Sequence, residues 1–113
     1  MSPTCLFCRI VRKEIPAQIV AEDEHCIAFR DVSPQAPVHV LVVPREHVDS
    51  LAQAKDPVAL GRILLMAAEV ARAERITDGG YRTVLNTNAE AGQTVFHLHA
   101  HVLGGRKMTW PPG

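Results

Sequence analysis

His97-Leu98-His99-Ala100-His101-Val102-Leu103 is the stretch that decides the fold. Three histidines alternate with apolar residues, and only an extended strand places every second residue on one face. We therefore expect a strand over 97–103, with three imidazoles in a row, each about 6.5–7 Å from the next. A helix would scatter the same histidines, because each residue turns by about 100°. Imidazole titrates near neutral pH, binds metals and acts as a nucleophile, so the row indicates a reactive site.

The bulk composition is that of one soluble domain over residues 1–113. The chain is 47% hydrophobic and 21% charged, and its formal net charge is zero, which argues against duplex nucleic acid as a partner. No apolar run is long enough to span a membrane, and the first residues lack a signal-peptide pattern. Three cysteines cannot all pair with one another, so we expect a reducing, cytoplasmic environment.

The remaining sequence predicts an α+β domain with a mostly antiparallel sheet. The main helix has Asp56 as its expected N-cap and Pro57 at its first position, where a missing N–H costs nothing. Two extended stretches around Glu22-Asp23-Glu24 predict a hairpin. The expected elements are helices over 6–13 and 56–75, strands over 17–22, 25–30, 38–43, 81–86 and 97–103, and a polar loop over 87–92.

Cys5-Leu6-Phe7-Cys8 places two cysteines at a spacing with three interpretations: half of a zinc site, a redox pair, or coincidence. Redox pairs usually open a helix that follows a strand, and no strand can precede Cys5. A zinc site needs two further ligands, and histidines elsewhere in the chain are available.

Two kinds of chemistry suit the three histidines of the 97–103 stretch. They could bind zinc from alternate strand positions, or one could attack phosphorus while its neighbours stabilise the oxyanions. The sequence has no Gly-x-x-x-x-Gly-Lys-Ser/Thr loop and no evident carboxylate cluster for magnesium. Phosphorus chemistry without a metal favours a histidine nucleophile and a covalent intermediate. The residues alone leave both possibilities open.

The 97–103 stretch resembles the signature of the histidine triad (HIT) family, His-x-His-x-His followed by apolar residues. The resemblance covers nearly the whole chain and is closest to the Hint branch. It implies a HIT-like α+β fold: a five-stranded antiparallel sheet with one main helix and one short N-terminal helix, continued across a homodimer. Trp110 would lie near the partner's active site. Further matching segments are Arg12-Lys13-Glu14-Ile15-Pro16, Asp31-Val32-Ser33-Pro34-Gln35-Ala36-Pro37, Gly92-Gln93-Thr94-Val95-Phe96, Gly104-Gly105-Arg106 and Trp110-Pro111-Pro112-Gly113.

The same resemblance implies a nucleotide-binding hydrolase, a purine nucleoside phosphoramidase. It would cleave the P–N bond of purine nucleoside 5′-phosphoramidates, or aminoacyl-adenylates, through a nucleotidyl-histidine on His99, with no catalytic metal or organic cofactor. His101 and His39 would orient His99 and hydrogen-bond the phosphate, and Asp31 would hold the ribose hydroxyls. The phosphate would also meet Thr94, backbone N–H groups near Gln93 and Val95, and Asn86. The base pocket would be formed by Leu6, Phe7, Ile10, Ile15, Ile27 and Phe29.

A structural zinc ion is implied by a more distant resemblance. Members of the wider superfamily, including galactose-1-phosphate uridylyltransferase, bind zinc with a Cys-x-x-Cys, a distant histidine and the first histidine of a triad-like motif. In this sequence those positions are Cys5, Cys8, His47 and His97. In a protein without the metal, His47 and His97 would hydrogen-bond to each other.

Two alternative functions stay open at this point. One is hydrolysis of dinucleoside polyphosphates, as in the fragile-histidine-triad branch, although that branch lacks this Trp-Pro-Pro-Gly tail. The other is a nucleotide-binding adaptor in which hydrolysis is incidental.

Overall fold

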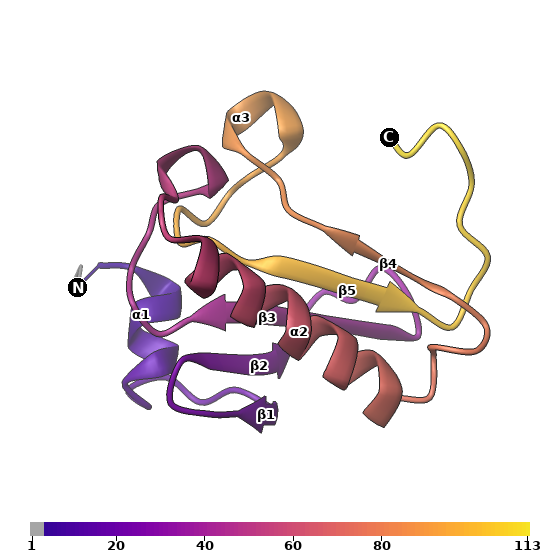
Figure 1. The fold of residues 1–113 in the computed structure, drawn as a ribbon, viewed down its shortest axis with the longest axis horizontal. Coiled ribbons are helices and arrows are strands. Elements are labelled where there is room, and N and C mark those ends of the chain that lie inside the picture. Colours follow the sequence, from indigo (N-terminus) through magenta and orange to yellow (C-terminus); the bar gives the residue numbers. More distant parts are fainter. Residues whose placement is uncertain (1–3) are drawn as a thin grey trace.

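A five-stranded antiparallel sheet of order β1-β2-β3-β5-β4 is the frame of the computed structural model, which describes residues 4–113 (Figure 1). No helix of this described part is long and apolar enough to cross a membrane. The strands are β1 (Ile19–Glu22), β2 (Cys26–Arg30), β3 (Val38–Pro44), β4 (Tyr81–Val84) and β5 (Ala100–Gly104). The helices are α1 (Leu6–Val11), α2 (Pro57–Ala73), α3 (Asn88–Ala91) and a 3₁₀ turn over Leu51–Gln53.

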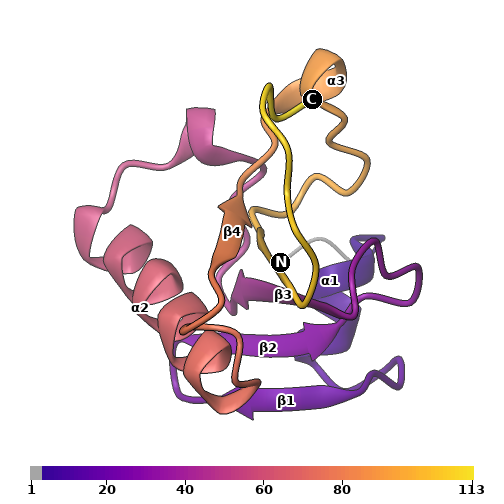
Figure 2. The same ribbon diagram turned by 90° about the vertical axis from the view of Figure 1, so that its right-hand side faces the viewer.

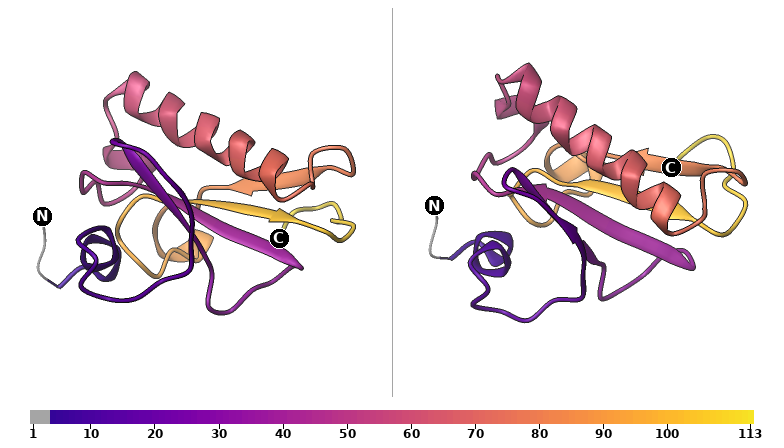
Figure 3. Two further views of the ribbon diagram at one scale, coloured as in Figure 1. Left: turned by 90° about the horizontal axis from the view of Figure 1, so that it is seen from below. Right: turned by 60° about the horizontal axis from the view of Figure 1, so that its bottom comes forward.

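The main helix α2 covers one face of the sheet (Figure 3). It starts as the sequence predicts, with the Asp56 carboxylate accepting the Val58 N–H and Pro57 in the first turn. Its apolar stripe packs on the inward-facing residues of β2, β3 and β5, and this cluster is the larger of the two cores. Its fully buried members include Ile63, Ala71, Val40, Val42, Ala100 and Val102.

The short helix α1 lies on the opposite face, at one end of the sheet (Figures 2 and 3). Phe7 and Ile10 of α1 form a second core with residues of β2 and β3, including Leu41. Alternate residues of a strand point to opposite faces, so His39 shares the α1 face with Leu41. His101 pairs with Leu41 across β3 and β5 and therefore faces the same way. His39 and His101 thus lie on the face of the sheet opposite to α2.

The strand expected over 97–103 is shorter than the alternation predicts. β5 begins at Ala100, so only His101 lies in the regular strand. The Leu98 N–H donates to the Val48 carbonyl instead of to β3, and Pro44 at the end of β3 has no N–H to continue the ladder. The ring centroids of His99 and His101 are 4.9 Å apart, closer than the spacing of about 6.5–7 Å expected along a regular strand.

The other differences are small and have local causes. Helix α1 ends at Val11, and Lys13 adopts a positive φ of 63°, which breaks the helical path. The segment 87–92, expected as a loop, contains the single turn α3 and ends at Gly92 with a φ of 93°. The predicted hairpin is confirmed by the antiparallel pairing of β1 with β2.

Candidate active site

A cavity of about 720 Å³ opens beside α1, on the face of the sheet that carries His101. Its size falls in the range of small-molecule sites. Apolar side chains form most of the wall. The polar residues that line it are Gln18, Arg30, Asp31, Thr94, His99 and His101. The apolar residues in the wall include Leu6, Phe7, Ile10, Ile15, Phe29 and Leu41. A flat apolar ring with a polar extension would fit this combination.

A relay of hydrogen bonds fixes the proton positions on His39 and His101. The Gln35 N–H donates to His39 Nδ1 at 3.0 Å, so the proton of a neutral His39 sits on Nε2. His39 Nε2 lies 2.9 Å from His101 Nδ1 and donates to it. His101 therefore carries its own proton on Nε2, from which it can donate to a ligand.

His99 has the opposite polarity to His101. Its Nδ1 lies 2.7 Å from the backbone carbonyl of His97, and a carbonyl can only accept, so Nδ1 carries the proton. The lone pair is then on Nε2, which makes that nitrogen the nucleophilic atom. The His99 ring packs edge to face against Phe7, with 5.0 Å between the ring centroids. The side chain is also buried, with 7% exposure, so its surroundings restrict its orientation.

Burial keeps these histidines neutral at physiological pH. Desolvation lowers the pKa of His101 to about 4, and repulsion from His99 and His39 adds to the effect. Desolvation also lowers the pKa of His99 and of His39. A neutral imidazole keeps the lone pair that a nucleophile needs.

The same shift predicts a stability that depends on pH. The His101 pKa is about 6.5 in the unfolded chain and about 4 in the folded protein, so the unfolded chain binds more protons between these values. We expect the free energy of unfolding to fall as the pH is lowered from about 6.5 towards about 4. Urea titrations across this interval measure the slope, and His101→Asn, which keeps an acceptor for His39 but does not titrate, should show a shallower one. An equal slope in this variant would contradict the prediction.

Asp31 lies at the polar end of the cavity, held by its own turn. One carboxylate oxygen accepts the Ser33 N–H at 2.7 Å, and the other lies 3.5 Å from His39 Nε2. Thr94 and Val95 also line the cavity, and within residues 4–113 their backbone N–H groups donate to no other protein group. Such N–H groups are available to an anion.

The structure brings most of the predicted site residues to this cavity, but not all of them. Among the described residues, four predicted ligand contacts do not line it. Ile27 is fully buried in the core beneath the pocket, and His39 lies behind His101. The other two are Asn86 and Gln93. Leu41 was missed, although it follows His39 at the strand period of two and therefore shares its face.

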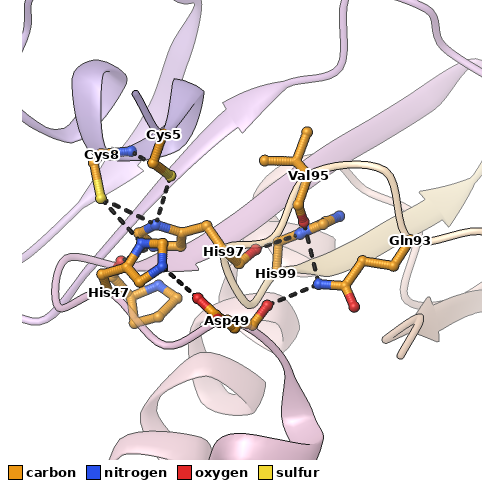
Figure 4. Close-up of polar contacts among 9 residues, drawn as sticks. Cys5, Cys8, His47, Asp49, Gln93, Val95, His97 and His99 are labelled. Atoms are coloured by element: carbon orange, nitrogen blue, oxygen red, sulfur yellow. Dashed lines mark hydrogen bonds and ion pairs between the residues drawn. The ribbon is translucent and has the colours of Figure 1, made fainter. Parts of the chain in front are cut away.

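A second cluster joins Cys5, Cys8, His47 and His97, whose ligand atoms all lie within 4.8 Å of one another (Figure 4). His97 Nδ1 lies 3.4 Å from Cys5 Sγ and 3.5 Å from Cys8 Sγ, and His47 Nδ1 lies 3.2 Å from Cys8 Sγ. The expectation for a protein without the metal was a hydrogen bond between His47 and His97, but the ring nitrogens of both residues face the cysteine sulfurs and other acceptors instead. Their rings meet edge to face with centroids 4.9 Å apart.

The Nε2 atoms of both histidines in this cluster, which point away from the sulfur pair, donate hydrogen bonds to acceptors. His97 Nε2 donates to the Pro44 carbonyl at 2.8 Å, and His47 Nε2 to the Asp49 carboxylate at 2.7 Å. Both Nδ1 lone pairs therefore point at the sulfur pair. Two sulfur and two nitrogen donors with such outer partners match the requirements of a tetrahedral structural zinc site. The second-sphere role of Asp49 was not predicted, since nothing in the sequence marks it.

Comparisons with known proteins agree with this geometry. The family model "HIT domain" matches residues 12–108. An uncharacterized HIT-like protein from Synechococcus elongatus is 53% identical over 115 aligned positions, covering 100% of both chains. The crystal structure of a HIT family hydrolase from Legionella pneumophila superposes with a TM-score of 0.95 at 48% identity, over 97% of this chain and 100% of that one. A zinc-bound histidine triad family protein from Mycobacterium smegmatis matches with a TM-score of 0.84 at 32% identity, over 91% of this chain and 76% of that one.

Proposed function

This chain belongs to the HIT domain family and has the fold of HIT family hydrolases, and we propose that it hydrolyses purine nucleoside 5′-phosphoramidates, including aminoacyl-adenylates. The observation that carries the proposal is the proton arrangement at the cavity. His99 offers an Nε2 lone pair, and His101 offers an Nε2 proton beside it. This is the arrangement that attack on a phosphate ester or amide requires.

The cavity supports a definite placement of the substrate. The purine would lie against Phe7, Ile10 and Phe29, and the ribose hydroxyls would donate to the Asp31 carboxylate. The phosphate would then reach the end of the cavity that Thr94 and the two histidines line. The side chains of Phe7, Ile10 and Phe29 carry no charge, so this placement accepts adenine or guanine.

The reaction runs in two displacements at phosphorus. His99 Nε2 forms a bond to phosphorus while the P–N bond breaks, and the leaving nitrogen takes up a proton from solvent, so that the amine departs neutral. His101 donates from Nε2 to the phosphoryl oxygens, whose charge grows in the transition state. Water then attacks phosphorus, releases the nucleoside monophosphate and restores neutral His99.

The Cys5–Cys8–His47–His97 cluster supports a structural zinc ion in the same protein. When bound, zinc would supply a cross-link between α1, which carries Phe7 of the purine wall, and the segment that carries His99. The His97 side chain would be a ligand while its carbonyl holds His99 Nδ1. The metal would thus stabilise the site without taking part in the reaction.

The homodimer remains a proposal and is supported by the surface. β4 is an edge strand, and the unpaired N–H and C=O groups of an edge strand can pair with a strand of another chain. Leu64 and Leu65 of α2 are exposed, and Trp110 is 81% exposed with the Arg82 guanidinium 6.0 Å from its ring centroid. We expect light scattering to give about twice the chain mass of 12.4 kDa, and Leu65→Asp to lower it. A monomer mass for the unaltered protein would contradict the dimer.

A comparison of substrates tests the proposed activity. The purified protein should hydrolyse adenosine and guanosine 5′-phosphoramidates with kcat/KM at least about 100-fold above that for diadenosine polyphosphates, because a protonated amine leaves readily. The reverse preference would assign the protein to dinucleoside polyphosphate hydrolysis. Tight binding of nucleotides without turnover of either substrate would favour an adaptor.

A further inference from the structure

The side chain of Gln93 is buried, with 5% exposure, and its amide makes three hydrogen bonds inside the protein, using both N–H donors. Its Oε1 accepts the Asn88 N–H at 2.8 Å. Its Nε2 donates to the carbonyl of Asp49 at 2.8 Å and to that of Val95 at 3.1 Å. One donor and two acceptors surround the amide, so its orientation is fixed by its partners.

These bonds join parts of the chain that no strand connects, and Figure 4 shows those from Gln93 to Asp49 and to Val95. Residues 92–99 lie outside the β5 ladder, and Thr94 and Val95 of this segment line the cavity. The Asp49 carbonyl belongs to the residue whose carboxylate accepts from His47. The Gln93 amide therefore ties the segment 94–95 to the outer partner of the Cys/His cluster.

We propose that Gln93 is a positioning residue for the phosphate-binding backbone and that it does not itself touch the nucleotide. This inference rests on the proposed function, because it assigns the phosphate to the end of the cavity lined by Thr94 and Val95. The amide sets where the Thr94 and Val95 N–H groups stand relative to His99. The resemblance implies a phosphate contact from a backbone N–H near Gln93, but the N–H of Gln93 itself donates to the Asn88 carbonyl at 3.1 Å.

The assignment makes the effect of Gln93 specific to the phosphate. The base and ribose walls come from α1, the segment 15–18, β2, β3 and the loop at Asp31. The Gln93 amide hydrogen-bonds to none of these parts. Loosening the 94–95 segment should therefore weaken ligands that carry a phosphate and leave the nucleoside alone unaffected. A side chain needed only for general stability would affect both ligands equally.

Two variants remove the amide donors without changing the length of the side chain greatly. Gln93→Glu can still accept from Asn88 but turns a carboxylate towards two carbonyl oxygens, and Gln93→Met removes every hydrogen bond without adding charge. Gln53→Met, at an exposed position of the 3₁₀ turn, is the matched control. Thermal unfolding of each variant is recorded first, and calorimetry then measures binding of adenosine monophosphate and of adenosine.

We expect both Gln93 variants to bind adenosine monophosphate about 10- to 100-fold more weakly, with a similar loss in kcat/KM, because small misplacements at a reacting centre have effects of this size. Adenosine binding should stay within about twofold of that of the Gln53→Met control. Unchanged binding of adenosine monophosphate in folded variants would overturn the inference. An equal loss for both ligands, or failure of both variants to fold, would also overturn it by making Gln93 structural. If the unaltered protein itself binds no adenosine monophosphate, the proposed function fails instead.

Discussion

Replacing His99 with alanine is expected to lower kcat/KM for adenosine 5′-phosphoramidate by about 10⁴- to 10⁶-fold, the range seen when an enzyme loses its nucleophile. The reason is the proton arrangement: His99 Nδ1 donates to the His97 carbonyl, so Nε2 is free to attack. In His101, Nδ1 accepts from His39, so its lone pair is occupied and it cannot substitute. Steady-state kinetics with product analysis measures the effect.

Two controls belong with the His99→Ala variant. His25→Ala removes a half-buried histidine that does not line the cavity and should leave kcat/KM within about twofold. Binding of adenosine monophosphate to His99→Ala should persist, because Thr94, Asp31 and the apolar wall remain in place. Turnover by His99→Ala at the rate of the unaltered protein would remove the nucleophile assignment and return the three histidines to the metal-hydrolase interpretation.

Replacing Cys8 with serine is expected to remove the zinc ion and to lower the melting temperature by at least about 10 °C. Structural zinc in small domains contributes apparent binding free energies of about 10–16 kcal/mol, and each kcal/mol shifts the melting temperature of a domain this size by about 4–8 °C. Cys8 Sγ lies within 3.5 Å of both His47 and His97, so its loss breaks the centre of the donor set. Metal analysis and thermal unfolding measure the two effects.

The third cysteine provides the matched control for the zinc prediction. Cys26 is buried in the core under α2, away from the cluster, and burial raises the pKa of its thiol to about 11. Cys26→Ala should keep one zinc ion per chain. Protein that contains no zinc when purified in zinc-supplemented medium, and whose melting temperature a chelator does not change, would contradict the metal site.

The sequence predicted the parts of the fold that depend on local pattern. Capping, turn and periodicity rules predict the Asp56–Pro57 start of α2, the hairpin around residues 22–24 and the strand character of 38–43. The structure confirms all of these. The start of β5 was wrong because alternation describes side chains but not backbone partners. Pairing ends where His97 Nε2 donates to the Pro44 carbonyl and the Leu98 N–H donates to the Val48 carbonyl.

The site was predictable only as far as residue types and resemblance reach. The sequence predicted the metal donor set and most of the cavity residues, because the chemistry of cysteine and histidine follows from the residue type alone. The roles of Asp49 and Gln93 were not predicted. The Gln93 amide acts through a hydrogen bond to the Asp49 carbonyl, 44 residues away, and the Asp49 carboxylate accepts from His47, a contact that no residue pattern marks. Likewise, the tautomers of His39, His99 and His101 follow from a backbone N–H and a backbone carbonyl, which no side-chain pattern records.

The most direct test of the central claim is a single-turnover reaction of adenosine 5′-phosphoramidate with excess protein, quenched in alkali and followed by mass spectrometry of the peptides. Phosphorus–nitrogen bonds to histidine survive alkali better than acid, so a covalent intermediate can be mapped. We predict an adenylyl group on the His99 peptide that forms and decays at rates consistent with turnover, and its absence in His99→Ala. Product formation at the full rate with no adduct at any time, or with an adduct on a different residue, would contradict it.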